Sequence, residues 1–162
     1  MITVTVLTIL TLGVLPLVKV SVKRQKEQQL RETLRQIRTA IEEFHRDTIG
    51  APCTGVGVVP QPNPNIDPRS RVFITDCTIF GVDNPDRYPP DLETLVNGVN
   101  VQDKKVRFMR EIPVDPMTKR KDWGFRCVSD DPDSHSWCGK NVFDVYSNSH
   151  DTGTDGRPYS EW

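Results

Sequence analysis

Residues 1–47 constrain the fold of this chain more than any other stretch, because they read as one long helix with two different halves. The first half, residues 1–18, contains no charged side chain. The second half is rich in charge but has apolar residues at spacings of four, three, four and three, which place them on one stripe of a helix. We call this stripe the seam; it consists of Leu30, Leu34, Ile37, Ile41 and Phe44. The seam predicts that the second half packs on a globular domain formed by the later residues.

The uncharged half predicts burial in lipid or among similar helices. A helix of about 18 residues is roughly 27 Å long, which is marginal for a bilayer core of about 30 Å. A secretory signal peptide is the alternative, but it would want a basic region before the apolar run and a small-residue cleavage site after it, and this sequence has neither. We therefore interpret the chain as an apolar membrane or filament-core helix, its amphipathic continuation and a globular domain, over residues 1–22, 23–49 and 50–162.

The charge balance and the cysteines set limits on partners and compartment. The formal net charge is -1, so no bulk field favours nucleic acid as a partner. Four cysteines without a CxxC pair, behind an apolar segment, suit an oxidising compartment and up to two disulfides. Four cysteines allow three pairings, and four buried free thiols are the alternative. We favour the pairings that close short loops, Cys53–Cys77 and Cys127–Cys138.

The basic residues after the apolar run conflict with that compartment. Lys19, Lys23, Arg24 and Lys26 would normally face the cytoplasm, where disulfides are rare. The conflict suggests insertion by dedicated machinery, or residues upstream of Met1.

The segment that follows the long helix predicts irregular structure and then a short helix. Residues 50–87 are rich in proline, so we interpret them as an ordered loop with one short strand within residues 71–80. Residues 88–98 predict a short helix: Pro90 fits its first turn, Asp91 favours its positive end, and Gly98 stops it.

The last third of the chain predicts two paired strands and a tail. Residues 123–128 and 142–146 have the aromatic or alternating content of strands, and the connection between them is rich in turn-forming residues. We expect the polar tail to fold back through its apolar anchors, Tyr159 and Trp162. The predicted fold class is therefore α+β: a long N-terminal helix packed on a small domain with a short helix and antiparallel β-strands.

The order of these parts resembles the type IV pilin-like family, most closely the major pseudopilin of type II secretion systems. Pro16 lies where that family has a proline in its apolar half. YPPDLETLV, residues 88–96, is similar to the family's tyrosine-proline opening of a short helix. FMREIPVDPMT, residues 108–118, resembles its apolar-Pro-x-Asp-Pro turn, and FDVYSNS with the Asp-Gly tail resembles its last strand and C-terminal loop.

The departures from the family pattern are specific. The family's basic leader, its cleavage site, and its early phenylalanine and glutamate do not occur in this sequence. Aligning the helix on Pro16 places the family's mature start before Met1, so the resemblance implies that these residues lie upstream. Residues 50–87 are longer than the family would have, and the cysteines are atypical, which favours a specialised filament.

The resemblance implies a structural subunit, not an enzyme. Many copies would assemble through their N-terminal helices into an extracytoplasmic filament, with an inner-membrane assembly platform and minor pseudopilins as partners. The chain would lie in the inner membrane before assembly and then in a periplasmic or cell-surface filament. The residues expected at the helix contacts are Leu10, Gly13, Pro16 and Leu17. The rival interpretation is a monomeric single-pass, membrane-anchored extracytoplasmic binding domain.

The resemblance also implies a calcium site in the C-terminal loop. Asp151, Asp155 and Ser147 are the candidate ligands, with Asp144 and Asn148 as helpers. Calcium binds six to eight oxygens, which short loops rich in Asp, Asn, Ser and Gly supply. The alternative is that these carboxylates form turns in water.

The remaining polar residues point to no chemistry. The chain lacks the Gly-x-Ser-x-Gly and His-Glu-x-x-His motifs and a phosphate-binding glycine loop. The alternating charges of residues 23–46 are typical of a solvated helix face. We interpret the acidic cluster Asp130, Asp131 and Asp133 as a solvated hairpin tip.

Overall fold

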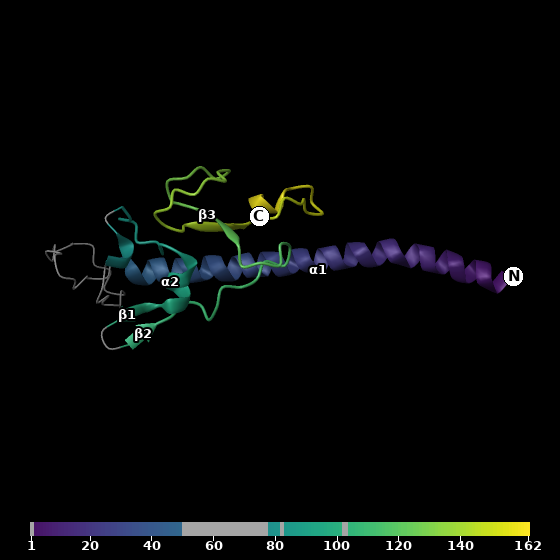
Figure 1. Ribbon diagram of the computed structural model, residues 1–162, viewed down its shortest axis with the longest axis horizontal. Helices are drawn as coiled ribbons and strands as arrows, with labels where there is room; N and C mark the ends of the chain where they lie inside the picture. Colours follow the sequence, from purple (N-terminus) through teal and green to yellow (C-terminus); the bar gives the residue numbers. More distant parts are fainter. Residues whose placement is uncertain (1, 50–77, 82, 102–103) are drawn as a thin grey trace.

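One helix organises the whole molecule. The computed structural model describes residues 2–49, 78–81, 83–101 and 104–162, and it describes side chains from Val20 onward. Helix α1 spans Ile2–Thr48, 47 residues, so it is about 70 Å long. Figure 1 shows its second half beside the C-terminal domain, which we call the head, while its first half extends away from the head. The predicted long helix is confirmed, and it is continuous over Ile2–Thr48.

The seam forms the centre of the hydrophobic core, as its spacing predicts. All five seam residues are buried: Leu30, Leu34, Ile37, Ile41 and Phe44. They belong to one cluster with apolar residues from several described segments of the head. The head contributes Phe80, Tyr88, Leu92, Leu95, Val99, Trp123, Val142, Val145 and Tyr159. The globular part is therefore completed by the second half of α1.

A short 3₁₀ helix, η1 (Thr78–Phe80), and helix α2 (Leu92–Asn97) lie near the C-terminal end of α1. The Asp91 side chain caps α2 by accepting a hydrogen bond from the Thr94 amide. Gly98 ends the helix with a φ of 76°, and a side chain there would collide with the Val106 carbonyl. The predicted short helix and its stop are thus confirmed. The strand expected within residues 71–80 falls mostly outside the described residues, and its described end is η1.

Two small antiparallel sheets complete the head. Strands β3 (Trp123–Arg126) and β4 (Asp144–Ser147) pair with Gly124 opposite Tyr146. The Tyr146 ring lies where a side chain on Gly124 would be, so this position requires glycine. Strands β1 (Val99–Val101) and β2 (Lys104–Val106) form a hairpin that the sequence patterns did not predict. A final 3₁₀ helix, η2 (Tyr159–Glu161), ends the described chain, and the fold class is α+β.

The disulfide between Cys127 and Cys138 closes the connection between β3 and β4, as predicted. Cys53 and Cys77 lie outside the described residues. Within the part of the chain whose side chains are described, no helix has both the length and the apolar content needed to cross a bilayer. The apolar residues 1–18 lie outside that part.

Candidate functional site

Three polar residues of α1 contact the end of the chain, and we call them the polar stripe: Lys23, Glu27 and Arg31. We define the C-terminal segment as residues 151–162. The Lys23 ammonium donates to the Thr152 carbonyl at 2.8 Å. The Arg31 guanidinium lies 3.5 Å from the Asp155 carboxylate and stacks 4.2 Å from the centre of the Trp162 ring. Because α1 residues four apart share a face, these contacts form one continuous docking surface.

Glu27 is the centre of this surface. Its carboxylate accepts from the Thr154 amide at 2.8 Å, the Thr154 hydroxyl at 2.6 Å and the Tyr159 hydroxyl at 3.0 Å. The side chain is only 5% exposed. Burial alone would raise the pKa of Glu27, but the hydrogen bonds from Thr154 and Tyr159 outweigh it and hold the pKa below its ordinary value. The stripe is therefore a structural contact, and its interpretation as a solvated face is wrong at Glu27.

A second polar network ties α1 to β4 and to the last residue. The Arg38 guanidinium donates to the Asp144 carboxylate at 2.7 Å, to the Val145 carbonyl at 3.0 Å and to the Trp162 main-chain oxygen at 2.7 Å. Arg126 is 6% exposed, lies 4.3 Å from the centre of the Tyr146 ring, and approaches the other Asp144 oxygen at 3.4 Å. Asp144 therefore pairs with two guanidinium groups, one at each carboxylate oxygen.

The candidate calcium ligands have protein partners instead. The Asp155 carboxylate accepts from Arg157 at 3.0 Å and pairs with Arg31, and the Arg157 amide chiefly lowers its pKa. The Ser147 hydroxyl donates to the buried Asp115 carboxylate at 2.6 Å. Asp151 is exposed, and its main-chain oxygen accepts from the Tyr159 amide at 3.2 Å.

The two helpers are committed in the same way. Asp144 pairs with Arg38 and Arg126, and the Asn148 side-chain amide donates to the Asp122 carboxylate at 3.2 Å. Guanidinium groups at Asp144 and Asp155 occupy positions that a cation would need. This arrangement does not fit a calcium ion.

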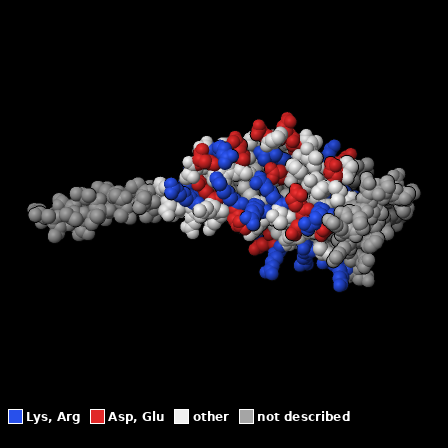
Figure 2. All heavy atoms as spheres, turned by 180° about the vertical axis from the view of Figure 1, so that it is seen from behind, with Lys and Arg blue, Asp and Glu red and all other residues white. Residues whose placement is uncertain are grey.

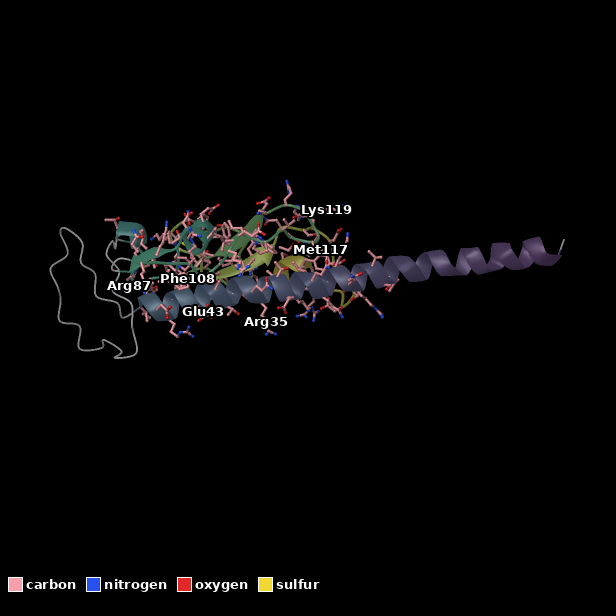
Figure 3. All side chains as sticks on the ribbon, turned by 90° about the horizontal axis from the view of Figure 1, so that it is seen from below. Arg35, Glu43, Arg87, Phe108, Met117 and Lys119 are labelled. Carbon is pink, nitrogen blue, oxygen red and sulfur yellow. A yellow bond between two sulfur atoms is a disulfide. The ribbon has the colours of Figure 1, made fainter. Side chains whose placement is uncertain are left out.

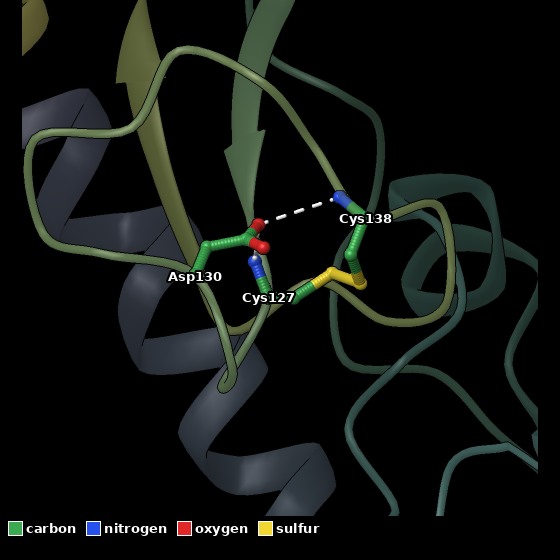
Figure 4. A group of neighbouring side chains, drawn as sticks. All are labelled: Cys127, Asp130 and Cys138. Atoms are coloured by element: carbon green, nitrogen blue, oxygen red, sulfur yellow. Dashed lines mark hydrogen bonds between the residues drawn. A yellow bond between two sulfur atoms is a disulfide. The ribbon is translucent and has the colours of Figure 1, made fainter.

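A different group of candidate ligand atoms lies on the β3–β4 connection. The ligand atoms of Cys127, Asp130 and Cys138 lie within 4.8 Å of one another. Figure 4 shows the two sulfurs joined to each other, so neither is available as a thiolate. The Asp130 carboxylate accepts from the amides of Cys127 at 2.8 Å and Cys138 at 3.4 Å. In its oxidised form this group braces the connection and does not fit a metal ion.

A groove of about 530 Å³ runs between α1 and residues 108–113. Figure 3 labels Phe108 on the head side of this region and Glu43 and Arg35 along α1. The Phe108 ring closes the groove against the core, with its centroid 5.2 Å from that of Phe44. The charged lining residues carry both signs, which suits a solvated contact surface: Glu32, Arg35, Glu43, Arg110 and Glu111.

The histidines occupy separate environments on the head. The His45 ring stacks on Tyr88 with centroids 4.0 Å apart. His135 and His150 line a hollow of about 300 Å³ beside Tyr146. Within the described residues, no group of three candidate metal-ligating side chains includes a histidine. Among the described residues, the three histidines therefore do not come together in one site.

The contact between Glu27 and Tyr159 predicts a loss of stability in alkali. Burial chiefly, and the hydrogen bond to Glu27, raise the pKa of Tyr159 to about 12. Because this folded-state pKa exceeds the unfolded value, the contribution is complete below about pH 10 and is lost as pH rises to about 12. We expect urea unfolding to show a decrease of roughly 1–3 kcal/mol across that range. The Tyr159→Phe variant should lack this part of the decrease, and an identical alkaline profile would contradict the prediction.

The sequence analysis missed Glu27, Arg38 and Arg126, which carry the polar networks. The four-residue spacing of Lys23, Glu27 and Arg31 was visible, but a solvated helix has the same spacing. The expected assembly residues lie in the part of α1 whose side chains are not described: Leu10, Gly13, Pro16 and Leu17.

Comparisons with protein-family models, with curated proteins and with solved structures found no match. The resemblance to pseudopilins therefore remains an expectation from the sequence.

Proposed function

We propose that this protein is the structural subunit of an extracytoplasmic pilus-like filament, either a type II secretion pseudopilus or a related type IV pilus-like fibre. The observation that carries the proposal is the separation of α1 into two parts. The second part completes the core of the head, whereas the first extends away from it (Figure 1). The transition is abrupt, since Val20 and Val22 are each 47% exposed and Glu27 is 5% exposed.

The projecting part supports assembly through its composition. Residues 2–22 extend about 30 Å beyond Lys23, the first side chain of the stripe. Residues 1–18 carry no charge and are mostly apolar, so a helix made of them has no charged face to present to water. Each Leu or Val side chain removed from water contributes roughly 1.5–3 kcal/mol. Such a rod needs lipid before assembly and neighbouring rods afterwards.

Assembly follows from placing these rods side by side. The contact is heterologous, because one part of the rod meets a different part of the next copy, and such contacts do not close. The inner membrane would hold the subunit first, and an assembly platform with minor pseudopilins would promote the polymer in the cell. The heads then cover the outside of a periplasmic or cell-surface filament. This role requires no catalytic group and no nucleic acid.

Removal of residues 1–22 tests the proposal. The truncated chain keeps every buried residue and every stripe contact described above, so we expect it to stay folded and monomeric. The full chain should form filaments, visible by electron microscopy after slow removal of detergent. Size-exclusion chromatography and circular dichroism would report the state of the truncated chain.

A full-length variant tests the same contact without shortening the chain. Leu10→Glu with Leu17→Glu puts two charges on the rod and should prevent filaments without changing the unfolding of the head. Filaments from the truncated chain would contradict the helix-core idea. A full chain that stays monomeric with its rod in detergent would instead favour the membrane-anchored binding domain.

A further inference from the structure

One side of the head carries a group of exposed cations. We define the basic hairpin as β2 and the residues after it, with the charged side chains Lys104, Lys105, Arg107 and Arg110. All four are exposed. Within the described part of the chain, none of them forms an ion pair. Four like charges within seven residues repel one another, so this surface favours an anionic partner.

The head also carries an exposed acidic surface on a rigid support. We define the acidic tip as Asp131 and Asp133, on the connection between β3 and β4. Both residues are exposed, and neither forms an ion pair among the described residues. The Cys127–Cys138 disulfide and the hydrogen bonds of Asp130 fix this connection. The same connection carries Lys140, and its three aspartates outnumber this one cation, so the net charge of the connection is negative.

The two surfaces lie on opposite sides of the molecule. In Figure 1, strands β1 and β2 lie on one side of α1, and the connection that follows β3 lies on the other. Figure 2 is turned about the vertical axis, so up and down are the same as in Figure 1. It shows Lys and Arg side chains projecting from the lower edge of the head, and Asp and Glu side chains on the upper edge. The basic hairpin and the acidic tip of one molecule therefore cannot meet. They can meet between two copies.

We infer that, in the assembled polymer, the basic hairpin of one copy binds the acidic tip of the next. This inference rests on the proposed filament. Complementary surfaces on opposite sides make a heterologous contact, which continues from copy to copy without closing. Charges on such surfaces fix the register and speed the encounter more than they add affinity. The apolar rods thus drive assembly, and the heads set how successive copies are aligned.

An anionic lipid surface is a poorer partner for the basic hairpin. The hairpin is anchored near the end of α1, because the Phe108 amide bonds the Leu95 carbonyl and the Phe108 ring packs on Phe44. Phe44 lies 26 residues beyond Val18, the end of the uncharged stretch, which is about 39 Å along the helix. Several Debye lengths separate the hairpin from a membrane that holds the rod.

Charge reversal on the full chain tests the contact. The first variant combines Lys105→Glu with Arg107→Glu, and the second combines Asp131→Lys with Asp133→Lys. Each should raise the protein concentration needed for filaments by about tenfold in low salt, because attraction at exposed pairs becomes repulsion. The fourfold variant carries both changes and should assemble as the unaltered chain does. Added salt should reduce the differences, since these charges are exposed.

The outcomes separate this contact from the filament itself. If the unaltered chain forms no filaments, the proposed function fails. If it forms filaments and both double variants do so equally well, the contact between heads is wrong. If the fourfold variant is as impaired as either double variant, the two surfaces do not pair. Urea unfolding of each variant in detergent shows whether the head is intact, and Arg24→Glu with Lys119→Glu provides a matched reversal of two exposed cations outside both surfaces.

Discussion

Replacing Phe44 with alanine is expected to lower the free energy of unfolding by about 3–5 kcal/mol. Phe44 is the last residue of the seam and is fully buried. Its ring centroid lies 5.9 Å from that of Phe80 and 5.2 Å from that of Phe108, so it joins α1 to two separate segments of the head. Truncation removes these aromatic contacts and leaves a cavity into which the surrounding structure relaxes only in part. Urea unfolding monitored by far-UV circular dichroism would measure the loss.

Two further variants establish that the loss reflects packing. Phe44→Leu keeps most of the volume and should cost roughly 1–2 kcal/mol. Glu42→Ala alters an exposed neighbour on the same turn of α1 and should change stability by less than about 0.5 kcal/mol. If Phe44→Ala cost no more than Glu42→Ala, α1 and the head would not share one core, and the seam would have another purpose.

The seam illustrates what the sequence can predict. Its residues recur with the helical period and have no polar interruption, so burial is the only economical interpretation. Helix α2 could also be predicted, because Asp91 at its start and Gly98 at its end act on the backbone within a few residues. Strands β3 and β4 and the Cys127–Cys138 disulfide were also predicted, since the strands alternate and the cysteines flank a short connection. Each of these signals lies within a few residues of the element that it predicts.

The polar contacts could not be predicted in this way. Glu27 meets Thr154 and Tyr159 across more than 125 residues of sequence, and a carboxylate on a helix looks the same whether water or protein covers it. The hairpin of β1 and β2 was missed for a different reason. Each strand has three residues, too few for alternation to appear, and two lysines in β2 read as loop. Long-range polar partners and very short strands depend on the tertiary fold.

The structure differs from the calcium expectation in the contacts that the C-terminal segment makes. The C-terminal segment needs an anchor, because Tyr159 is its only fully buried side chain among the described residues. The resemblance implies a calcium ion bound by Asp151, Asp155 and Ser147. In the structure, the polar stripe of α1 anchors the C-terminal segment, with Glu27 at the centre of the stripe. The two arrangements predict different responses to mutation and to chelation.

Replacing Glu27 with alanine is expected to lower the free energy of unfolding by about 2–4 kcal/mol and to release the C-terminal segment. The change leaves the Tyr159 hydroxyl and the Thr154 amide without their acceptor in a buried position. Glu27→Gln keeps the shape and one acceptor oxygen, so it should lose roughly half as much. Hydrogen exchange at the Thr154 amide should accelerate strongly in Glu27→Ala, while exchange in β3 follows only the global loss of stability.

Calcium provides the contrasting arm of that experiment. The carboxylate of Asp155 is already paired with Arg157 and Arg31, so a cation would first have to displace a guanidinium group. We therefore expect the unaltered chain to unfold at the same urea concentration in EDTA and in millimolar calcium. A ligand present at about a hundred times its dissociation constant would add roughly 2.7 kcal/mol. A calcium-dependent gain of that size, together with an unchanged Thr154 exchange rate in Glu27→Ala, would show that a bound cation and not α1 holds the C-terminal segment.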